Sequence, residues 1–395
     1  MANTIKLKRG TSTPTTSNIV DGEVAIDKTA KKLYVNDGGT IKEIGGGGGV
    51  VSDSNNNTVG GTNAGDSITS ATDCTFFGKD AGTDITDGQF NTFLGSSAGS
   101  NTNSGIYLNT FVGYQAGSNN GNGNHNIFLG ANAGLNNEAW DNVFIGNYSG
   151  DANTSGTQNV FLGKNSGTAN TTGSYNTVLG FEAGKSLTTS SYGVYIGYQA
   201  GETYSSENQF GASAICIGAQ SGENATGVKN TILGTKAGQS MGSAANCVLI
   251  GNETAKNRTG NYNVAIGMSA LPASGAGANT VAIGFYSGGA LTSGDNCLFL
   301  GHQAGDNGTT GDNNICIGAN SDLSAADVSN EITLGDGNIT KFRIPALSFS
   351  ISASAVTNGA AFYENAKTVA ADYTLSGSNA MAAGPITINS SVTVT

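Results

Sequence analysis

A glycine recurs along most of this chain at a nearly constant interval of 17 residues. Each copy belongs to a block that can be written N-x-h-h-G-x-x-A-G, where h is an apolar residue, as in Asn126–Gly134. The intervals range from 16 to 21 residues, and most are 17. A repeat of this length indicates one structural unit per copy, stacked into a solenoid. The repeat glycines are residues 61, 78, 95, 113, 130, 146, 163, 180, 197, 218, 234, 251, 267, 284, 301, 318 and 335.

The three residues before each repeat glycine have the chemistry of β-strands. They are mostly apolar and often β-branched or aromatic, as in Val143–Ile145 and Val160–Leu162, which favours extended backbone. Asn, Ser, Thr and Gly fill the stretches between them, as is typical of turns, and no 3.6-residue apolar period is present. We therefore expect an all-β fold, a parallel β-solenoid (β-roll) of about seventeen 17-residue coils. At one strand spacing per coil its length would be about 80 Å.

The alternation of side chains along each strand predicts which residues face the inside of the solenoid and which face outward. Counting back from the glycine, positions −1 and −3 share one face and position −2 points to the other, yet all three are apolar in most copies. With −1 and −3 inward, the row at −2 would be an exposed hydrophobic stripe, which soluble monomers avoid. We therefore expect this row to form the seam of a homo-oligomer. The predicted seam residues are Phe76, Phe93, Phe111, Phe128, Phe144, Phe161, Tyr195 and Phe299.

The residues on either side of the strand are also regular. Ala or Ser lies three positions after most of the repeat glycines, and a second Gly usually follows it, which predicts close backbone approach and a turn with positive φ. An Asn recurs just before the strand, as at Asn126 and Asn142. We expect these side chains to form a hydrogen-bonded ladder along the coils that satisfies turn amides.

Composition narrows the function. With 2 His, 1 Trp and 11% charged residues, the chain has little material for a His-based catalytic or metal site, and we predict no enzyme activity, cofactor or metal. The net charge of −11 disfavours nucleic-acid binding. No apolar run is long enough for a transmembrane helix, and the N-terminus lacks the apolar stretch of a secretory signal. Cysteines that share a repeat position lie at least three coils apart, too far for disulfides, so we expect free thiols.

Several repeats carry a family resemblance. Asn263–Gly267 and Thr280–Gly284 resemble the head repeats of trimeric autotransporter adhesins. Asn176–Gly184 is similar to repeats of phage fibre proteins, and the last copy, Asn330–Ile344, resembles the exit segment that precedes their terminal module.

The N-terminus carries a more specific resemblance. Ile5–Thr11, Asp21–Asp27 and Lys32–Gly38 resemble a short β-rich leader found on phage fibre and virion-appendage proteins. Together the resemblances cover nearly the whole chain. They imply a homotrimeric rod on the surface of a phage virion, either a tail or a capsid fibre, that mediates adhesion to the host surface.

Two alternatives remain open at this point. A bacterial trimeric surface adhesin would need the secretion signal and membrane β-barrel anchor of the autotransporters, neither of which is recognised in this sequence. A tailspike-like polysaccharide depolymerase usually has longer coils and a groove lined with carboxylates, whereas these repeats are short and carry few charges.

The same observations divide the chain into four parts. Residues 1–44 are the predicted leader, which would attach to tail or capsid proteins, and residues 45–56 are a Gly-rich linker that opens with five glycines. Residues 57–340 form the β-roll rod, and residues 341–395 a C-terminal β module.

Two loops hold candidate receptor contacts. One contains the single Trp, Trp140, together with Glu138, and the other, in the 21-residue repeat, contains Tyr204 and Phe210. Aromatic rings stack on sugars and amides hydrogen-bond them, so the partner we expect there is a host surface glycan or protein. The alternative interpretation is that both are ordinary inter-coil loops. Glu138 with Asp141, or Glu202 with Glu207, could be posed as a glycosidase pair, although nothing in the sequence raises either above coincidence.

Overall fold

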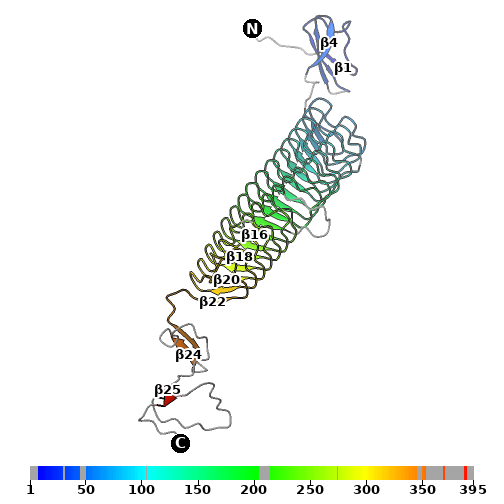
Figure 1. The fold of residues 1–395 in the computed structure, drawn as a ribbon. Helices are drawn as coiled ribbons and strands as arrows, with labels where there is room; N and C mark the ends of the chain where they lie inside the picture. Colours follow the sequence, from blue (N-terminus) through cyan, green and yellow to red (C-terminus); the bar gives the residue numbers. More distant parts are fainter. Residues whose placement is uncertain are drawn as a thin grey trace. The chain divides into compact units, whose positions relative to one another are not determined.

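The computed structural model describes residues 8–29, 32–44, 50–103, 105–203, 214–273, 275–344, 349–352, 368–369 and 387–388. Within these ranges all regular structure is β-strand. The strands form a small N-terminal sheet, one long parallel array and two short C-terminal pairs (Figure 1). The chain divides into two compact units, Met1–Leu334 and Gly335–Thr395. The all-β class expected from the repeat is confirmed.

The N-terminal sheet has four strands in the order β1-β2-β3-β4. They are β1 (Lys8–Gly10), β2 (Val24–Asp27), β3 (Lys32–Asp37) and β4 (Thr40–Ile44). β1 is parallel to β2, and the other two pairings are antiparallel. Gly38 and Gly39 have φ of 60° and 79°, as a tight two-residue turn between β3 and β4 requires. Ile19, Ala25 and Tyr34 form the small buried core.

Seventeen parallel strands, one per repeat, build the solenoid (Figure 1). Each is three residues long, ends just before its repeat glycine and pairs in register with the strand of the next coil, as Phe128 does with Phe144. β5 (Val51–Ser52) pairs antiparallel with β6 at the start. The predicted parallel β-solenoid is therefore confirmed. Its strands are β6 (Thr58–Gly60), β7 (Thr75–Phe77), β8 (Thr92–Leu94), β9 (Thr110–Val112), β10 (Ile127–Leu129), β11 (Val143–Ile145), β12 (Val160–Leu162), β13 (Thr177–Leu179), β14 (Val194–Ile196), β15 (Ile215–Ile217), β16 (Thr231–Leu233), β17 (Val248–Ile250), β18 (Val264–Ile266), β19 (Val281–Ile283), β20 (Leu298–Leu300), β21 (Ile315–Ile317) and β22 (Ile332–Leu334).

The two faces of these strands are the reverse of the sequence prediction. Side chains at position −2 point into the coil, whereas those at −1 and −3 lie on the outside, where Leu129 and Ile127 are 44% and 45% exposed. The predicted seam was wrong, because its aromatic row is buried before any second copy is present. Instead the rings from Phe93 to Phe161 stack on one another inside each chain, 4.6–5.0 Å between centroids. All eight predicted seam residues are 0% exposed in a single chain: Phe76, Phe93, Phe111, Phe128, Phe144, Phe161, Tyr195 and Phe299.

The physical reason lies in the second glycine of each repeat. Gly134 has a φ of 58°, and a Cβ added there would lie 2.5 Å from Cε2 of Phe128 in the same coil. The aromatic ring at −2 therefore occupies the space that this glycine leaves inside the coil. A large side chain at −2 therefore packs inside the coil only when the residue at this turn is small.

The recurrent Asn residues form the predicted ladder. Asn126 Nδ2 donates to the carbonyl of Ala139, and its Oδ1 accepts the backbone N–H of Asn142 in the next coil, at 2.8 and 2.9 Å. Both residues are 0% exposed. Each Asn side chain thus pairs with a buried backbone carbonyl and a buried backbone amide that the short strands leave without a partner. Burying these groups unpaired would destabilise the fold.

Where the residue at −2 is small, other positions fill the core. Ala265 and Ala282 occupy −2 in adjacent coils, and Leu271 replaces the second glycine between them, at a φ of 50° and with 0% exposure. Arg258, from the preceding coil, is also buried, at 1% exposure. Larger side chains at facing positions therefore fill the space that the small residues at −2 leave, and the core stays packed.

The C-terminal unit contains two described strand pairs. β23 (Lys341–Ile344) is antiparallel to β24 (Phe349–Ser352), and β25 (Thr368–Val369) is parallel to β26 (Thr387–Ile388). The rest of the predicted module after 344, and the five linker glycines at 45–49, lie outside the described residues. The proposed boundaries at 44, 56 and 340 stay predictions.

Candidate functional site

The outer face of the solenoid sheet is apolar along its whole length. We define this outer sheet face as positions −1 and −3 of strands β6–β22, where every residue is apolar except six threonines and Gly60. No charged side chain interrupts it. Seventeen strands of three residues cover roughly 80 by 10 Å, on the order of 800 Å², which exceeds the roughly 300–600 Å² of the largest apolar patch on a typical monomer. The outer sheet face is therefore the candidate interaction surface of this chain.

Exposed aromatic residues extend this surface at both ends of the strands. Just after the repeat glycines, Phe181 and Tyr198 stack with their ring centroids 5.7 Å apart. Just before the strands, Tyr175 and Tyr192 stack at 4.8 Å with their planes 3° apart. All four side chains are exposed in a single chain. The stacking follows from the register, since equal positions in adjacent coils lie one strand spacing apart.

The remaining surface of the coil is polar. A row of threonines runs along it, and the hydroxyl of each donates to the backbone carbonyl of the next coil, as Thr154 does to Thr171 and Thr171 to Thr188, both at 3.0 Å. The solenoid is therefore two-sided, with an apolar outer sheet face and a polar surface suited to water. This contrast makes the outer sheet face the candidate interaction surface of the solenoid.

The candidate receptor loops are only partly described. Trp140 is 54% exposed, and its Nε1 donates to the backbone carbonyl of Asn122 at 3.1 Å. Glu138, in the same loop, is exposed. Tyr204 and Phe210 lie outside the described residues. The structure thus places Trp140 and Glu138 on one exposed surface loop.

The described residues contain few features of a catalytic or metal site. No cluster of three or more His, Cys, Asp or Glu residues that could hold a metal ion occurs among them. Asp141 pairs with His125, Oδ1 to Nδ1 at 3.1 Å, on the exposed surface rather than in a cleft. The five cysteines are buried and unpaired, and burial raises the pKa of Cys216 and Cys316 to about 12, so these thiols stay protonated. In the parts of the chain that the structure covers, no helix could cross a membrane.

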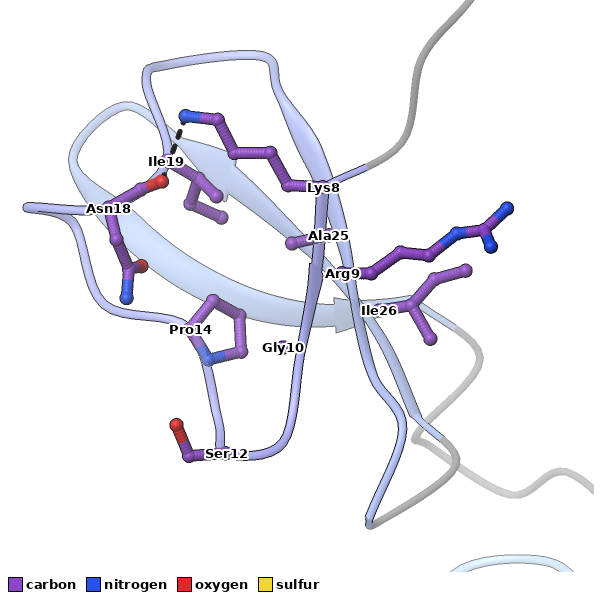
Figure 2. Close-up of a pocket in the computed structure, with 9 residues that line it drawn as sticks. All are labelled: Lys8, Arg9, Gly10, Ser12, Pro14, Asn18, Ile19, Ala25 and Ile26. Carbon is purple, nitrogen blue, oxygen red and sulfur yellow. Dashed lines mark hydrogen bonds between the residues drawn. The ribbon is translucent and has the colours of Figure 1, made fainter.

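The N-terminal sheet carries a small cavity, shown in Figure 2, of about 250 Å³. Ile19 and Ala25 are buried beside it and Lys8 extends toward Asn18, whereas the side chain of Arg9 points to the other side of β1 (Figure 2). Lys8 Nζ donates to the carbonyl of Asn18 at 2.9 Å and pairs with Glu23 at 2.8 Å, which holds the pKa of the Glu23 carboxyl below its usual value. The cavity is below the usual size range of small-molecule sites and suits a single inserted side chain.

The residue pattern predicted the apolar strands but placed the −2 row on the outside, whereas the structure buries it inside the coil. A signal for the correct assignment was present, since the buried Asn at −4 has the same parity as −2 and therefore points to the same side of the strand. Comparisons with family models, curated proteins and solved structures find no match to this chain.

Proposed function

We propose that this chain is a structural fibre protein of a phage virion, a tail or capsid fibre, that assembles as a homotrimer and mediates adhesion to the host surface. The observation that carries the proposal is the outer sheet face, which has no charged residue over seventeen strands. Its area, on the order of 800 Å², equals what one partner contributes to a standard stable interface. A partner with the same length and the same repeat is a second copy of the chain.

The threefold arrangement comes from the family resemblance, and the outer sheet face is compatible with it. Three solenoids packed about a common axis would each turn this face inward and leave the polar threonine surface in water. The aromatic rows beside the strands, such as Tyr175 with Tyr192, would lie at the rim of the contact. Burial of the apolar row would supply the driving force.

Assembly is tested by two substitutions on neighbouring residues that point to opposite sides. We expect Leu129→Asp to leave the coil folded but to reduce the mass in solution toward that of one chain, because the charge would be desolvated between subunits. Phe128→Asp, one residue away, is expected to unfold the coil because Phe128 is 0% exposed within it. Mass by analytical ultracentrifugation and folding by circular dichroism separate the two outcomes.

Ser155→Asp provides the matched control, since Ser155 is exposed on the polar surface. It should change neither mass nor folding. A wild-type chain that stays monomeric at tens of micromolar concentration, or a Leu129→Asp protein with the wild-type mass, would contradict the proposed assembly.

We assign attachment to the particle to residues 1–44. The sheet β1–β4 supports this role through its small cavity beside Ile19 and Ala25, which suits a single side chain of a tail or capsid protein. Antibodies raised against the solenoid should label intact particles in electron micrographs, and purified protein should compete with particles for adsorption to host cells. Unlabelled particles would contradict the virion location, and full adsorption in the presence of excess fibre would contradict the adhesive role.

A further inference from the structure

The single tryptophan of the chain is held in a fixed, exposed position. Trp140 lies three positions before the first residue of β11 and is 54% exposed, yet its indole N–H donates to the carbonyl of Asn122 in the preceding coil, at 3.1 Å. The hydrogen bond limits rotation of the ring. A large exposed ring that is already ordered loses little conformational entropy when a ligand covers it.

A second exposed ring lies in the same row, two coils before it. The backbone N–H of Asp141 donates to the carbonyl of Asn124, and that of His125 to the carbonyl of Tyr107, both at 3.1 Å. These bonds set Tyr107, Asn124 and Trp140 in register along the solenoid axis. Two coils separate the rings by about 10 Å at one strand spacing per coil, roughly the length of two linked pyranose rings.

An amide lies between the two rings. The Oδ1 of Asn124 accepts the backbone N–H of Tyr107 at 2.7 Å, which fixes the side chain. Its Nδ2 makes no hydrogen bond within the described part of the chain and can donate outward. We call the surface made by Tyr107, Asn122, Asn124 and Trp140 the corner surface. It combines aromatic area with fixed polar groups, as ligand sites do.

The ring faces distinguish this surface from the other exposed aromatic residues. Tyr175 and Tyr192 cover each other's faces at 4.8 Å, as Phe181 and Tyr198 do at 5.7 Å. Neither Tyr107 nor Trp140 has a stacking partner among the residues that the structure describes. Their electron-rich faces remain available to the C–H groups of a flat ligand.

The charge around the corner surface limits the ligand class. Residues 80–163 contain no Lys or Arg, so a sulfated, phosphorylated or uronic-acid polymer would find no cation there. His125 and Asp141, beside the surface, contact each other through Nδ1 and Oδ1 at 3.1 Å. Neutral sugars offer C–H faces for the two rings and hydroxyl groups for the Asn side chains and carbonyls.

We infer that the corner surface binds a neutral glycan chain lying along the solenoid axis, with one sugar on Trp140, one on Tyr107 and the Asn124 amide between them. This inference rests on the proposed adhesive function and names its ligand class. It does not depend on the outer sheet face, whose residues are different.

The experiment uses the intact assembled protein, where Trp140 is the only tryptophan and its fluorescence reports on this surface alone. The probes are neutral hexasaccharides of glucose, mannose and N-acetylglucosamine and a neutral bacterial O-polysaccharide, with heparin as the anionic comparison. We expect at least one neutral probe to change the emission with a saturable dependence and heparin to leave it unchanged. A null result across the neutral probes, or saturable binding of heparin alone, would overturn the inference.

Variants distinguish this surface from the rest of the molecule. Trp140→Ala and Tyr107→Ala should each weaken binding of the same probe, measured by calorimetry, at least tenfold, whereas Tyr192→Ala should leave it unchanged. Equal binding by Trp140→Ala would overturn the assignment. Acrylamide should quench Trp140 in the assembled protein, and full protection would show that a second copy covers the corner, which also overturns it. Mass and host-cell competition measured on the same variants report separately on the proposed fibre function.

Discussion

At the scale of single residues, the first glycine of each repeat meets two separate requirements. Gly130 has a φ of 138°, which L side chains rarely adopt, and a Cβ added there would lie 2.6 Å from the carbonyl of Gly146 in the next coil. The neighbour is backbone, so it cannot rotate away. The same pair of constraints applies to the repeat glycines from Gly61 to Gly301, which explains why glycine recurs at this position.

We therefore expect Gly130→Ala to destabilise the solenoid by at least about 2 kcal/mol, because strain and collision add. Gly105→Ala is the matched control, since Gly105 also has a positive φ, 74°, but has no atom closer than 4.0 Å to the added Cβ. It should cost only about 1 kcal/mol. Calorimetric melting of both variants measures the difference, and equal losses would show that the inter-coil contact does not matter.

Asp151 gives the solenoid a pH dependence of known sign. Burial raises the pKa of its carboxyl to about 6 from an ordinary value of 3.8, and Oδ1 has no hydrogen-bond partner among the described residues. The folded state therefore binds the proton more tightly than the unfolded state does. This contribution to stability is fully present below pH 4 and is lost as the pH rises through 6.

We predict that Asp151→Asn raises the melting temperature at pH 8, because the free energy of unfolding increases by an amount on the order of 1–2 kcal/mol. At pH 4 the substitution should have little effect. Asp141→Asn, at an exposed position, is the comparison variant. A melting difference between wild type and Asp151→Asn that does not change with pH would contradict the role assigned to this carboxyl.

The residue pattern predicted where the strands lie but not which of their side chains point into the coil. Alternation separated Phe128 from Ile127 and Leu129, and both sets are apolar, so hydrophobicity alone could not decide which one lies inside. The decision comes from shape, because only the side of Phe128 meets the space left by Gly134. Phe128 and Gly134 lie on opposite sides of the turn that follows the strand. The hydrophobic pattern of the strand does not predict the conformation of this turn, so it could not predict their contact.

At the scale of one coil, the buried polar residues were predictable only in part. The Asn ladder before the strands was expected from its recurrence, and the structure contains it. A second buried row at Asn120, Asn137, Asn153 and Asn170 was missed, although Nδ2 of Asn153 donates to Oδ1 of Asn137 at 2.6 Å. This position holds other residues in other coils, so recurrence gave no signal, and only the closure of the coil places it inside.

Arg258 occupies the same inner position and is an unusual core residue. Its Nε donates to the carbonyl of Gly277 at 3.1 Å and Nη1 to the carbonyl of Leu291, while Nη2 has no partner within the described ranges. Burial lowers the pKa of the guanidinium to about 10, and no salt bridge to it forms among the described residues. The charge is thus held in the core at a cost.

Replacing Arg258 by an apolar residue should increase the stability of the solenoid. Met241 fills the equivalent position one coil earlier and is 1% exposed. We predict that Arg258→Met melts at the same temperature or higher, with a gain of up to about 3 kcal/mol, because replacing a buried charge by a packed apolar chain removes the desolvation cost. Thermal melting monitored by circular dichroism measures it. A loss greater than about 1 kcal/mol would mean that the two hydrogen bonds outweigh that cost.

At the scale of the whole molecule, stability is expected to be nearly additive over coils. Each inner coil contacts its two neighbours through equal positions, so the contacts between coils depend on keeping the register. The outer sheet face is built from the same repeated positions and grows in step with the core. Any change that removes a complete coil from every copy of the chain should therefore preserve both the fold and the matching of the faces.

Deletion of residues 147–163 tests this directly, because it removes the 17-residue interval between two repeat glycines. Phe144 would then stack on Val178 and Asn142 would bond to Asn176, each with a residue of its own row. We predict a folded protein whose melting temperature falls by only a few degrees and whose assembled mass corresponds to the same number of shorter chains. Deletion of residues 147–154 removes half a coil, shifts every later residue out of its row and should cause aggregation. If the full-coil deletion aggregated as well, the coils could not be equivalent units and the additive description of the solenoid would fail.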